Sequence, residues 1–201
     1  MDSHTNVPAA LRVVEGARHP FRAAHWVTFH QLGFLQVVET AGKEHERLTE
    51  LIVQLALRRS FNLIAVDEWL PDRDTLYRAV RRHTLKIRET LDNPKIKRPM
   101  TCFQLLDLLM EADMQNRPTL ISNFFHHFYN ADVKLSLRDR ILEKCCLCAR
   151  RLSFSNPVVV LVPHLYTEEY NRFFPVLAAA ADEVVPVAES VSTDTSQISL
   201  F

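Results

Sequence analysis

A Gly-Lys pair between an apolar stretch and a helical pattern is the first feature that could do chemistry. Gly42 and Lys43 follow the apolar segment 32–39 and precede "HERLTELIVQLALRR". In the phosphate-binding pattern G-x-x-x-x-G-K-[ST], glycines let the backbone wrap the phosphates, lysine pairs with their charge and the hydroxyl holds magnesium. Here Val37 stands at the first glycine position and Glu44 at the hydroxyl position. We therefore expect a degenerate nucleotide site, in which Lys43 could still meet a phosphate.

Polar residues also follow three other apolar stretches of the chain. "FNLIAVDE" ends in Asp67 and Glu68, "PTLISN" ends in Ser122 and Asn123, and "VVVLVPH" ends in His164. Ligands of parallel α/β folds bind outside the carboxyl ends of the strands, so these are positions where chemistry is expected. Asp67 and Glu68 could equally solvate a strand end and cap the helix that follows.

The segment 78–98 concentrates positive charge in a chain that has 24 basic and 24 acidic residues. The segment contains only two acidic residues, Glu89 and Asp92. Its eight basic residues are Arg78, Arg81, Arg82, Lys86, Arg88, Lys95, Lys97 and Arg98. Helical spacing places four of them, Arg78, Arg81, Arg82 and Lys86, on roughly one face. Such a face can neutralise DNA phosphates without reading sequence, although a solvated helix face has the same composition.

The sequence closes with a short apolar peptide after a segment rich in Ser and Thr. Its residues are Gln197, Ile198, Ser199, Leu200 and Phe201. A terminal Leu-Phe pair buries nothing by itself, and exposed apolar groups are a solubility liability unless a partner covers them. In a partner's pocket Leu200 and Phe201 would supply apolar burial, and Gln197 would fix the orientation by hydrogen bonds.

Alternating strand and helix patterns position these residues. Apolar, β-branched stretches predict strands over 32–39, 61–69, 118–125, 156–164 and 183–187. Helical spacing of apolar residues predicts helices over 40–60, 73–91, 100–115, 136–154 and 167–182. We expect Thr101 and Ser136 to cap two of these helices and Pro175 to break the last one.

This order of elements predicts an α/β fold, with a mostly parallel sheet and helices on both faces, over residues 26–187. Residues 1–25 are expected to form a flexible arm and residues 188–201 a disordered tail. No apolar run is long enough to span a membrane, and no signal peptide is recognisable, so we expect a cytoplasmic protein. The cysteines of "CCLC" are interpreted as small buried side chains, with no metal site.

In the order of its motifs over about residues 26–187, the chain resembles the RecA-like recombinase superfamily of P-loop NTPases. The resemblance implies that Gly42 and Lys43 stand at the nucleotide-binding position. It also implies that Glu68 corresponds to the catalytic glutamate of these proteins, and His164 to the polar residue that senses the γ-phosphate.

The departures from that family matter for cofactor and activity. The magnesium-associated aspartate of the family corresponds here to Ser122 or Asn123, and the P-loop hydroxyl corresponds to Glu44. Both usual protein supports for Mg²⁺ are therefore missing. We expect no cofactor and little or no hydrolysis, and ATP with Mg²⁺ would serve only if the protein were a weak ATPase.

The last five residues, "QISLF", closely resemble the bacterial sliding-clamp-binding peptide, Gln-Leu-Ser/Asp-Leu-Phe, with Ile198 in place of leucine. A RecA-like body with this peptide resembles the ImuA family, accessory proteins of DNA damage tolerance and the SOS response. The expected partners are then the clamp and a translesion polymerase or RecA-type recombinase. Two alternatives stay open: a weak RecA-like ATPase in recombination, and a cell-division inhibitor similar to SulA, which is also RecA-like.

Overall fold

The computed structural model describes residues 34–40, 45–66, 70–111, 114 and 117–186. The predicted arm over 1–25 and the predicted tail over 188–201 lie outside these ranges. The strands are β1 (Leu35–Thr40), β2 (Phe61–Ala65), β3 (Pro94–Lys97), β4 (Thr119–Ser122), β5 (Val158–Pro163) and β6 (Glu183–Val185). The helices are α1 (His45–Arg58), α2 (Arg73–Arg81), α3 (Ile87–Leu91), α4 (Cys102–Met110), α5 (Leu135–Ser153) and α6 (Glu168–Ala180), with a 3-10 helix over His126–Tyr129.

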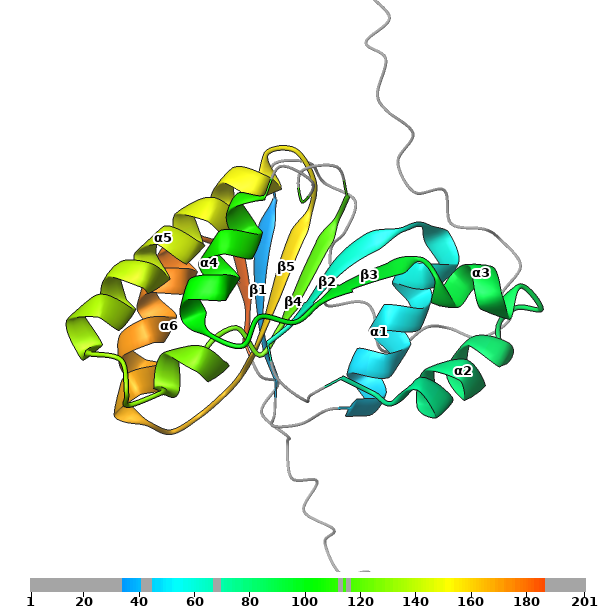
Figure 1. Cartoon of the computed structure of the whole chain (residues 1–201), viewed down its shortest axis with the longest axis horizontal. Coiled ribbons are helices and arrows are strands. Elements are labelled where there is room, and N and C mark those ends of the chain that lie inside the picture. Colours follow the sequence, from blue (N-terminus) through cyan, green and yellow to red (C-terminus); the bar gives the residue numbers. More distant parts are fainter. Residues whose placement is uncertain (1–33, 41–44, 67–69, 112–113, 115–116, 187–201) are drawn as a thin grey trace, which may run out of the picture.

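The six strands form one parallel sheet in the order β3-β2-β4-β5-β1-β6. Helices α1, α2 and α3 lie on one face of the sheet, and α4, α5 and α6 lie on the other (Figure 1). Right-handed crossovers explain this division, because the connections from β1 to β3 run toward one edge of the sheet and the later ones run back. The predicted α/β fold with a parallel sheet covered on both faces is confirmed.

Successive residues of the central strands supply the two halves of the hydrophobic core. Val37 on β1 is paired with Val160 on β5, and both pack with the α4–α6 layer. Their neighbours Val38 and Leu161 point to the other face and pack with α1. Because both of its faces are buried, β5 is continuously apolar and does not alternate with polar residues.

The predicted helix over 73–91 is two helices, α2 and α3, joined by a turn. The backbone N–H groups of His83 and Thr84 both donate to the carbonyl of Val80, at 2.9 and 3.1 Å. The Thr84 hydroxyl accepts a hydrogen bond from the Lys86 N–H at 3.1 Å. A hydroxyl that bonds to the nearby backbone competes with continuation of a helix, and here it helps to end α2.

The break changes where the predicted basic face lies. Arg78 and Arg81 are on α2, Arg82 is its C-terminal cap residue, and Lys86 belongs to the turn before α3. The four residues therefore do not share one continuous helix face. Leu85 suggested a continuing helix by its apolar character, but its side chain is 98% exposed.

Strand β3 is an edge strand that the sequence patterns did not predict. It has four residues, and among the described strands it pairs only with β2. Pro94 is its first residue, a position where the missing N–H of proline removes no bond from the ladder. Lys95 and Lys97 give it a polar character that is typical of edge strands and unlike the buried strands.

The predicted helix caps are partly correct. The Thr101 hydroxyl accepts a hydrogen bond from the Gln104 N–H at 3.2 Å, and thereby caps α4 as predicted. The prediction for Ser136 was wrong, because α5 begins at Leu135 and Ser136 is its second residue. Lys134 occupies the cap position there without a side-chain cap bond.

Pro175 does not break the last helix. Helix α6 runs through it, although a proline inside a helix removes one backbone hydrogen bond. Tyr170, Phe173 and Leu177 on α6 are buried in the core, and this burial opposes the cost of the missing bond. None of the helices in the described part of the chain is long and apolar enough to cross a membrane.

Candidate functional site

Several residues predicted to form sites lie outside the described residues. They are Gly42, Lys43 and Glu68, together with the peptide of residues 197–201. The structure does place the segments on either side of the first three. Helix α1 begins two residues after Lys43, and the described chain resumes at Leu70, two residues after Glu68.

His164 lies at the carboxyl end of the sheet, as predicted, in a hydrogen-bonded group with Glu39 and Tyr170. It follows β5 directly, and its N–H donates to the carbonyl of Thr40, the last residue of β1, at 2.9 Å. His164 Nδ1 lies 3.0 Å from Glu39 Oε1, and the Tyr170 hydroxyl donates to the same oxygen. An ionised carboxylate only accepts hydrogen bonds, so in that state Nδ1 of His164 carries the proton.

In this group Glu39 and Tyr170 are largely buried, whereas His164 is accessible to solvent. The side chain of Glu39 is only 10% exposed, and that of Tyr170 is buried against the stacked ring of Phe174. Burial, and then the hydrogen bond to Glu39, raise the pKa of Tyr170 well above its usual range. His164 is partly exposed and packs edge-on against Tyr166, whose side chain is 94% exposed. A partner could reach His164 from solvent, whereas Glu39 is committed to internal contacts.

Sequence reasoning missed Glu39 and Tyr170 as members of this group. Glu39 follows the same rule as His164, because it is a polar residue at the carboxyl end of a strand, and that signal could have found it. Tyr170 carries no such signal, since only the packing of α6 against the sheet brings it to Glu39.

The end of β4 offers no carboxylate to a metal ion. Ser122 is its last residue, and its buried hydroxyl lies 3.4 Å from the carbonyl of Ile64 on β2. Asn123 follows with φ of 49°, in the left-handed region that asparagine tolerates better than most residues. Within the described ranges, no group of three or more His, Cys, Asp and Glu side chains could hold a metal ion.

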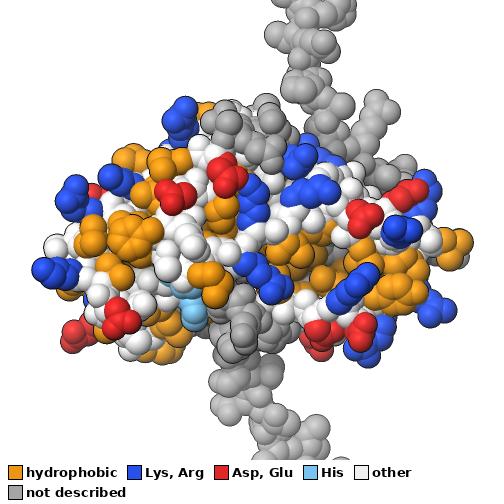
Figure 2. Space-filling view, in the orientation of Figure 1, with side chains coloured by type: hydrophobic (Ala, Val, Ile, Leu, Met, Phe, Trp, Pro, Cys, Tyr) orange, Lys and Arg blue, Asp and Glu red, His pale blue; other side chains and the backbone are white. Residues whose placement is uncertain are grey.

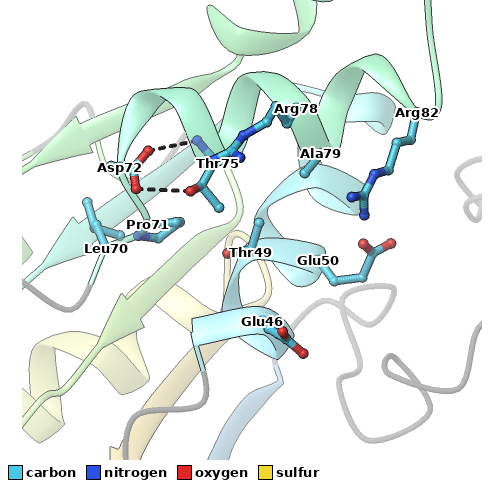
Figure 3. Close-up of a pocket in the computed structure, with 10 residues that line it drawn as sticks. All are labelled: Glu46, Thr49, Glu50, Leu70, Pro71, Asp72, Thr75, Arg78, Ala79 and Arg82. Carbon is cyan, nitrogen blue, oxygen red and sulfur yellow. Dashed lines mark hydrogen bonds between the residues drawn. The ribbon is translucent and has the colours of Figure 1, made fainter.

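A cavity of about 900 Å³ opens between α1 and α2 (Figure 3). It is lined by Glu46, Thr49, Glu50, Leu70, Pro71, Asp72, Thr75, Arg78, Ala79 and Arg82. Asp72 caps α2, and its carboxylate accepts hydrogen bonds from the backbone N–H and the hydroxyl of Thr75, at 2.7 and 2.9 Å. These bonds lower the pKa of Asp72, the backbone bond having the larger effect.

The two walls of the cavity carry opposite charge. Glu46 and Glu50 come from α1, whereas Arg78 and Arg82 come from α2 and its cap. Figure 3 shows Arg82 reaching across toward Glu50, whose carboxylate lies 3.6 Å from Nε2 of His83. A ligand with both positive and negative groups fits such walls better than a bare phosphate, which the glutamates would repel.

Cys145, Cys146 and the adjacent pair His126 and His127 lie in surroundings typical of residues that stabilise a fold. Cys145 and Cys146 are buried in the α4–α6 layer, and burial raises the pKa of both thiols, that of Cys146 to about 12. His127 Nε2 contacts the carbonyl of Pro99 at 2.8 Å, and its ring packs edge-on against His126. The interpretation of these cysteines as small buried side chains agrees with their surroundings.

Comparison with protein families finds no family model that matches this chain, and comparison with curated proteins finds no match either.

Proposed function

We propose that this protein is an accessory protein of bacterial DNA repair and translesion synthesis that binds the DNA polymerase sliding clamp through residues 197–201. The observation that carries the proposal is the peptide Gln-Ile-Ser-Leu-Phe, which fits the clamp-binding pattern at every position with one conservative change. In this role the folded body is an adaptor, and its partner is a translesion polymerase or a RecA-type recombinase.

The physical chemistry of the peptide suits this role. A few large apolar side chains that enter a dry pocket supply most of the affinity of a small interface. Leu200 and Phe201 are such side chains, and the amide of Gln197 can both donate and accept a hydrogen bond. Attachment of the body through a polar segment would raise the local concentration of its second partner near the clamp.

The body supports an adaptor better than a motor. A RecA-like ATPase needs a carboxylate and a hydroxyl to hold Mg²⁺. The chain has Glu44 where the hydroxyl is expected, and Ser122 at the end of β4 is buried against Ile64. In addition, Nδ1 of His164 contacts Glu39 within the protein, so this nitrogen is not free for a phosphate.

A clamp-binding titration tests the proposal directly. The full-length protein is titrated with a bacterial sliding clamp, in parallel with a chain that lacks residues 197–201 and with Leu200→Ala and Phe201→Ala. Deletion should abolish binding, and each substitution should cost about 2 kcal/mol, or about thirty-fold in affinity. Thr195→Ala, just outside the peptide, is the matched control and should bind like the unaltered chain.

The other functions predict different outcomes. If the truncated chain binds the clamp as well as the full chain does, the proposal fails. Cell filamentation that survives the truncation would favour a division inhibitor. ATP turnover that Glu68→Gln abolishes would favour the weak ATPase.

A further inference from the structure

The surface formed by α2, the turn over 82–86 and α3 combines positive charge with exposed apolar side chains. We call it the α2–α3 surface, and it consists of Tyr77, Arg81, Leu85, Lys86 and Arg88. All five side chains are exposed to solvent. The surface lies at the end of the molecule remote from α4–α6 (Figure 1), where Figure 2 shows Lys, Arg, Asp and Glu side chains around apolar ones.

The cations of the α2–α3 surface are only weakly neutralised. Lys86 Nζ lies 3.4 Å from Glu89 Oε2, but both side chains are about three-quarters exposed, and such pairs contribute little. Arg81 and Arg88 form no ion pair with any residue that the structure describes. Their charge is therefore available to an external anion. The wider segment 78–98 repeats this imbalance, with eight basic residues against two acidic ones.

The turn holds an apolar side chain among these cations. Leu85 is 98% exposed, and its neighbours on both sides are fixed by hydrogen bonds. The Thr84 N–H donates to the Val80 carbonyl, and the Thr84 hydroxyl accepts from the Lys86 N–H, both at 3.1 Å. The protruding position of Leu85 therefore follows from the backbone of the turn and is not a frayed helix end.

An aromatic ring adds to the exposed apolar area. Tyr77 is 43% exposed on α2 and precedes Arg81 by four residues, so the two side chains lie on the same side of the helix. Leu85 and Lys86 continue the surface beyond the end of the helix. This short segment of the chain therefore carries two exposed apolar side chains and three exposed cations.

We propose that the α2–α3 surface binds single-stranded DNA, with Arg81, Lys86 and Arg88 on the phosphates and Tyr77 and Leu85 on the bases. Proteins bind single strands by combining a cationic track for the backbone with side chains on which bases stack. In a duplex the base faces are covered, and exposing them costs unstacking energy, so Tyr77 and Leu85 favour a single strand. An acidic protein segment would pair with the cations but would offer no bases to Tyr77 and Leu85.

Binding of a labelled oligothymidine to the full-length protein tests this proposal, which adds a DNA partner to the adaptor role proposed above. The double substitution Arg81→Gln/Arg88→Gln should weaken binding by at least about tenfold and reduce the salt dependence. Because this variant cannot neutralise two of the phosphates, the slope of log K against log salt should become less steep by about 1.4. Tyr77→Ala should weaken binding by about tenfold, and Tyr77→Phe, which keeps the ring, should restore it.

Matched controls come from the opposite layer of the fold. Arg140→Gln/Arg151→Gln removes two exposed cations from α5, and Leu147→Ala removes a leucine that is 69% exposed on the same helix. Neither control should change binding, whereas Leu85→Ala should weaken it. Circular dichroism and thermal melting of every variant establish that the body is folded.

Four results with DNA would overturn the proposal, and a fifth comes from a competing peptide. The four are no binding to the oligonucleotide, equal binding to a duplex of the same length, binding that is insensitive to Tyr77 and Leu85, and an equal reduction in affinity with the α5 controls. Preference for a polyglutamate peptide over DNA would identify an acidic protein as the partner and would also reject it. Because the assay contains no clamp, its failure is distinct from a failure of clamp binding, which the same variants should retain.

Discussion

Glu39 and His164 are 125 residues apart in the sequence, but Oε1 of the glutamate lies 3.0 Å from Nδ1 of the histidine. They stand on the neighbouring strand ends of β1 and β5, where the Tyr170 hydroxyl donates to the same oxygen. A largely buried carboxylate with two donors is held in one orientation. The contact therefore joins three segments, β1, the end of β5 and α6, at the edge of the sheet where ligands of this architecture bind.

Removal of the Tyr170 hydroxyl should destabilise the protein. Tyr170→Phe leaves the buried Glu39 carboxylate without one of its donors, and hydrogen bonds to charged groups carry an above-average share of stability. We expect the free energy of unfolding to fall by about 1–2 kcal/mol in urea denaturation. Tyr166→Phe is the control and should be neutral, because that side chain is almost fully exposed. Equal effects of the two substitutions would show that the hydroxyl–carboxylate bond contributes nothing.

Alkaline pH should destabilise the fold from about pH 9 upward. Burial raises the pKa of the Cys145 and Cys146 thiols above their ordinary value of 9.0, so they stay protonated in the folded protein but ionise in the unfolded chain. The unfolded state then binds fewer protons, and stability falls by up to about 1.4 kcal/mol per pH unit for each thiol. Tyr129 and Tyr170 add to this effect above about pH 10, since burial raises their pKa values as well.

Urea denaturation at about pH 8 and about pH 10 measures this dependence, and Cys146→Ala should reduce the difference by about 1 kcal/mol. Cys148→Ala serves as a comparison, because Cys148 is only half-buried and should contribute less. A pH dependence that is unchanged in Cys146→Ala would contradict the assignment.

A carboxylate at the end of β4 should destabilise the protein. Ser122→Asp would place a charge in a buried site that faces the Ile64 carbonyl, another acceptor, and should cost several kcal/mol. Ser122→Ala removes only a long hydrogen bond and should cost about 0.5–1 kcal/mol. Chemical denaturation of both variants checks this contrast. If Ser122→Asp proved as stable as Ser122→Ala, the site would be open enough to have accepted the carboxylate of an ATPase.

Nucleotide should not stabilise the protein. Glu44 next to Lys43 and the lack of a carboxylate at Ser122 leave Mg²⁺-ATP without its usual ligands. We expect millimolar ATP with Mg²⁺ to move the melting temperature by less than about 1 °C, the result for a ligand whose Kd exceeds its concentration. Lys43→Ala should melt in the same way with and without nucleotide. A larger shift that Lys43→Ala removes would establish a phosphate site.

The parallel sheet could be predicted because its strands are buried on both faces and their apolar runs are unmistakable. Strand β3 was not predicted, because a four-residue edge strand has few apolar positions and because Pro94 is typical of the end of a helix. The break between α2 and α3 includes a bond from the Lys86 N–H to the Thr84 hydroxyl, which the sequence does not reveal, whereas the surrounding apolar spacing favours a single helix.

The candidate site was predictable in its location but not in its contacts. The rule that polar residues at strand ends meet at one edge of a parallel sheet placed His164 correctly. It could not supply Tyr170, which reaches Glu39 through the docking of α6 against β1. The exposure of Leu85 could not be predicted either, because the sequence pattern grouped it with the apolar residues of one long helix, such as Val80 and Ile87.

The position of β1 between β5 and β6 has a consequence for synthesis of the protein. Both hydrogen-bonding partners of this first strand belong to the last third of the chain. During translation β1 therefore leaves the ribosome long before β5 and β6 exist, and until they emerge its backbone has no native strand with which to pair. Such an intermediate is prone to aggregation, so the nascent chain should depend on chaperones until its final strands emerge.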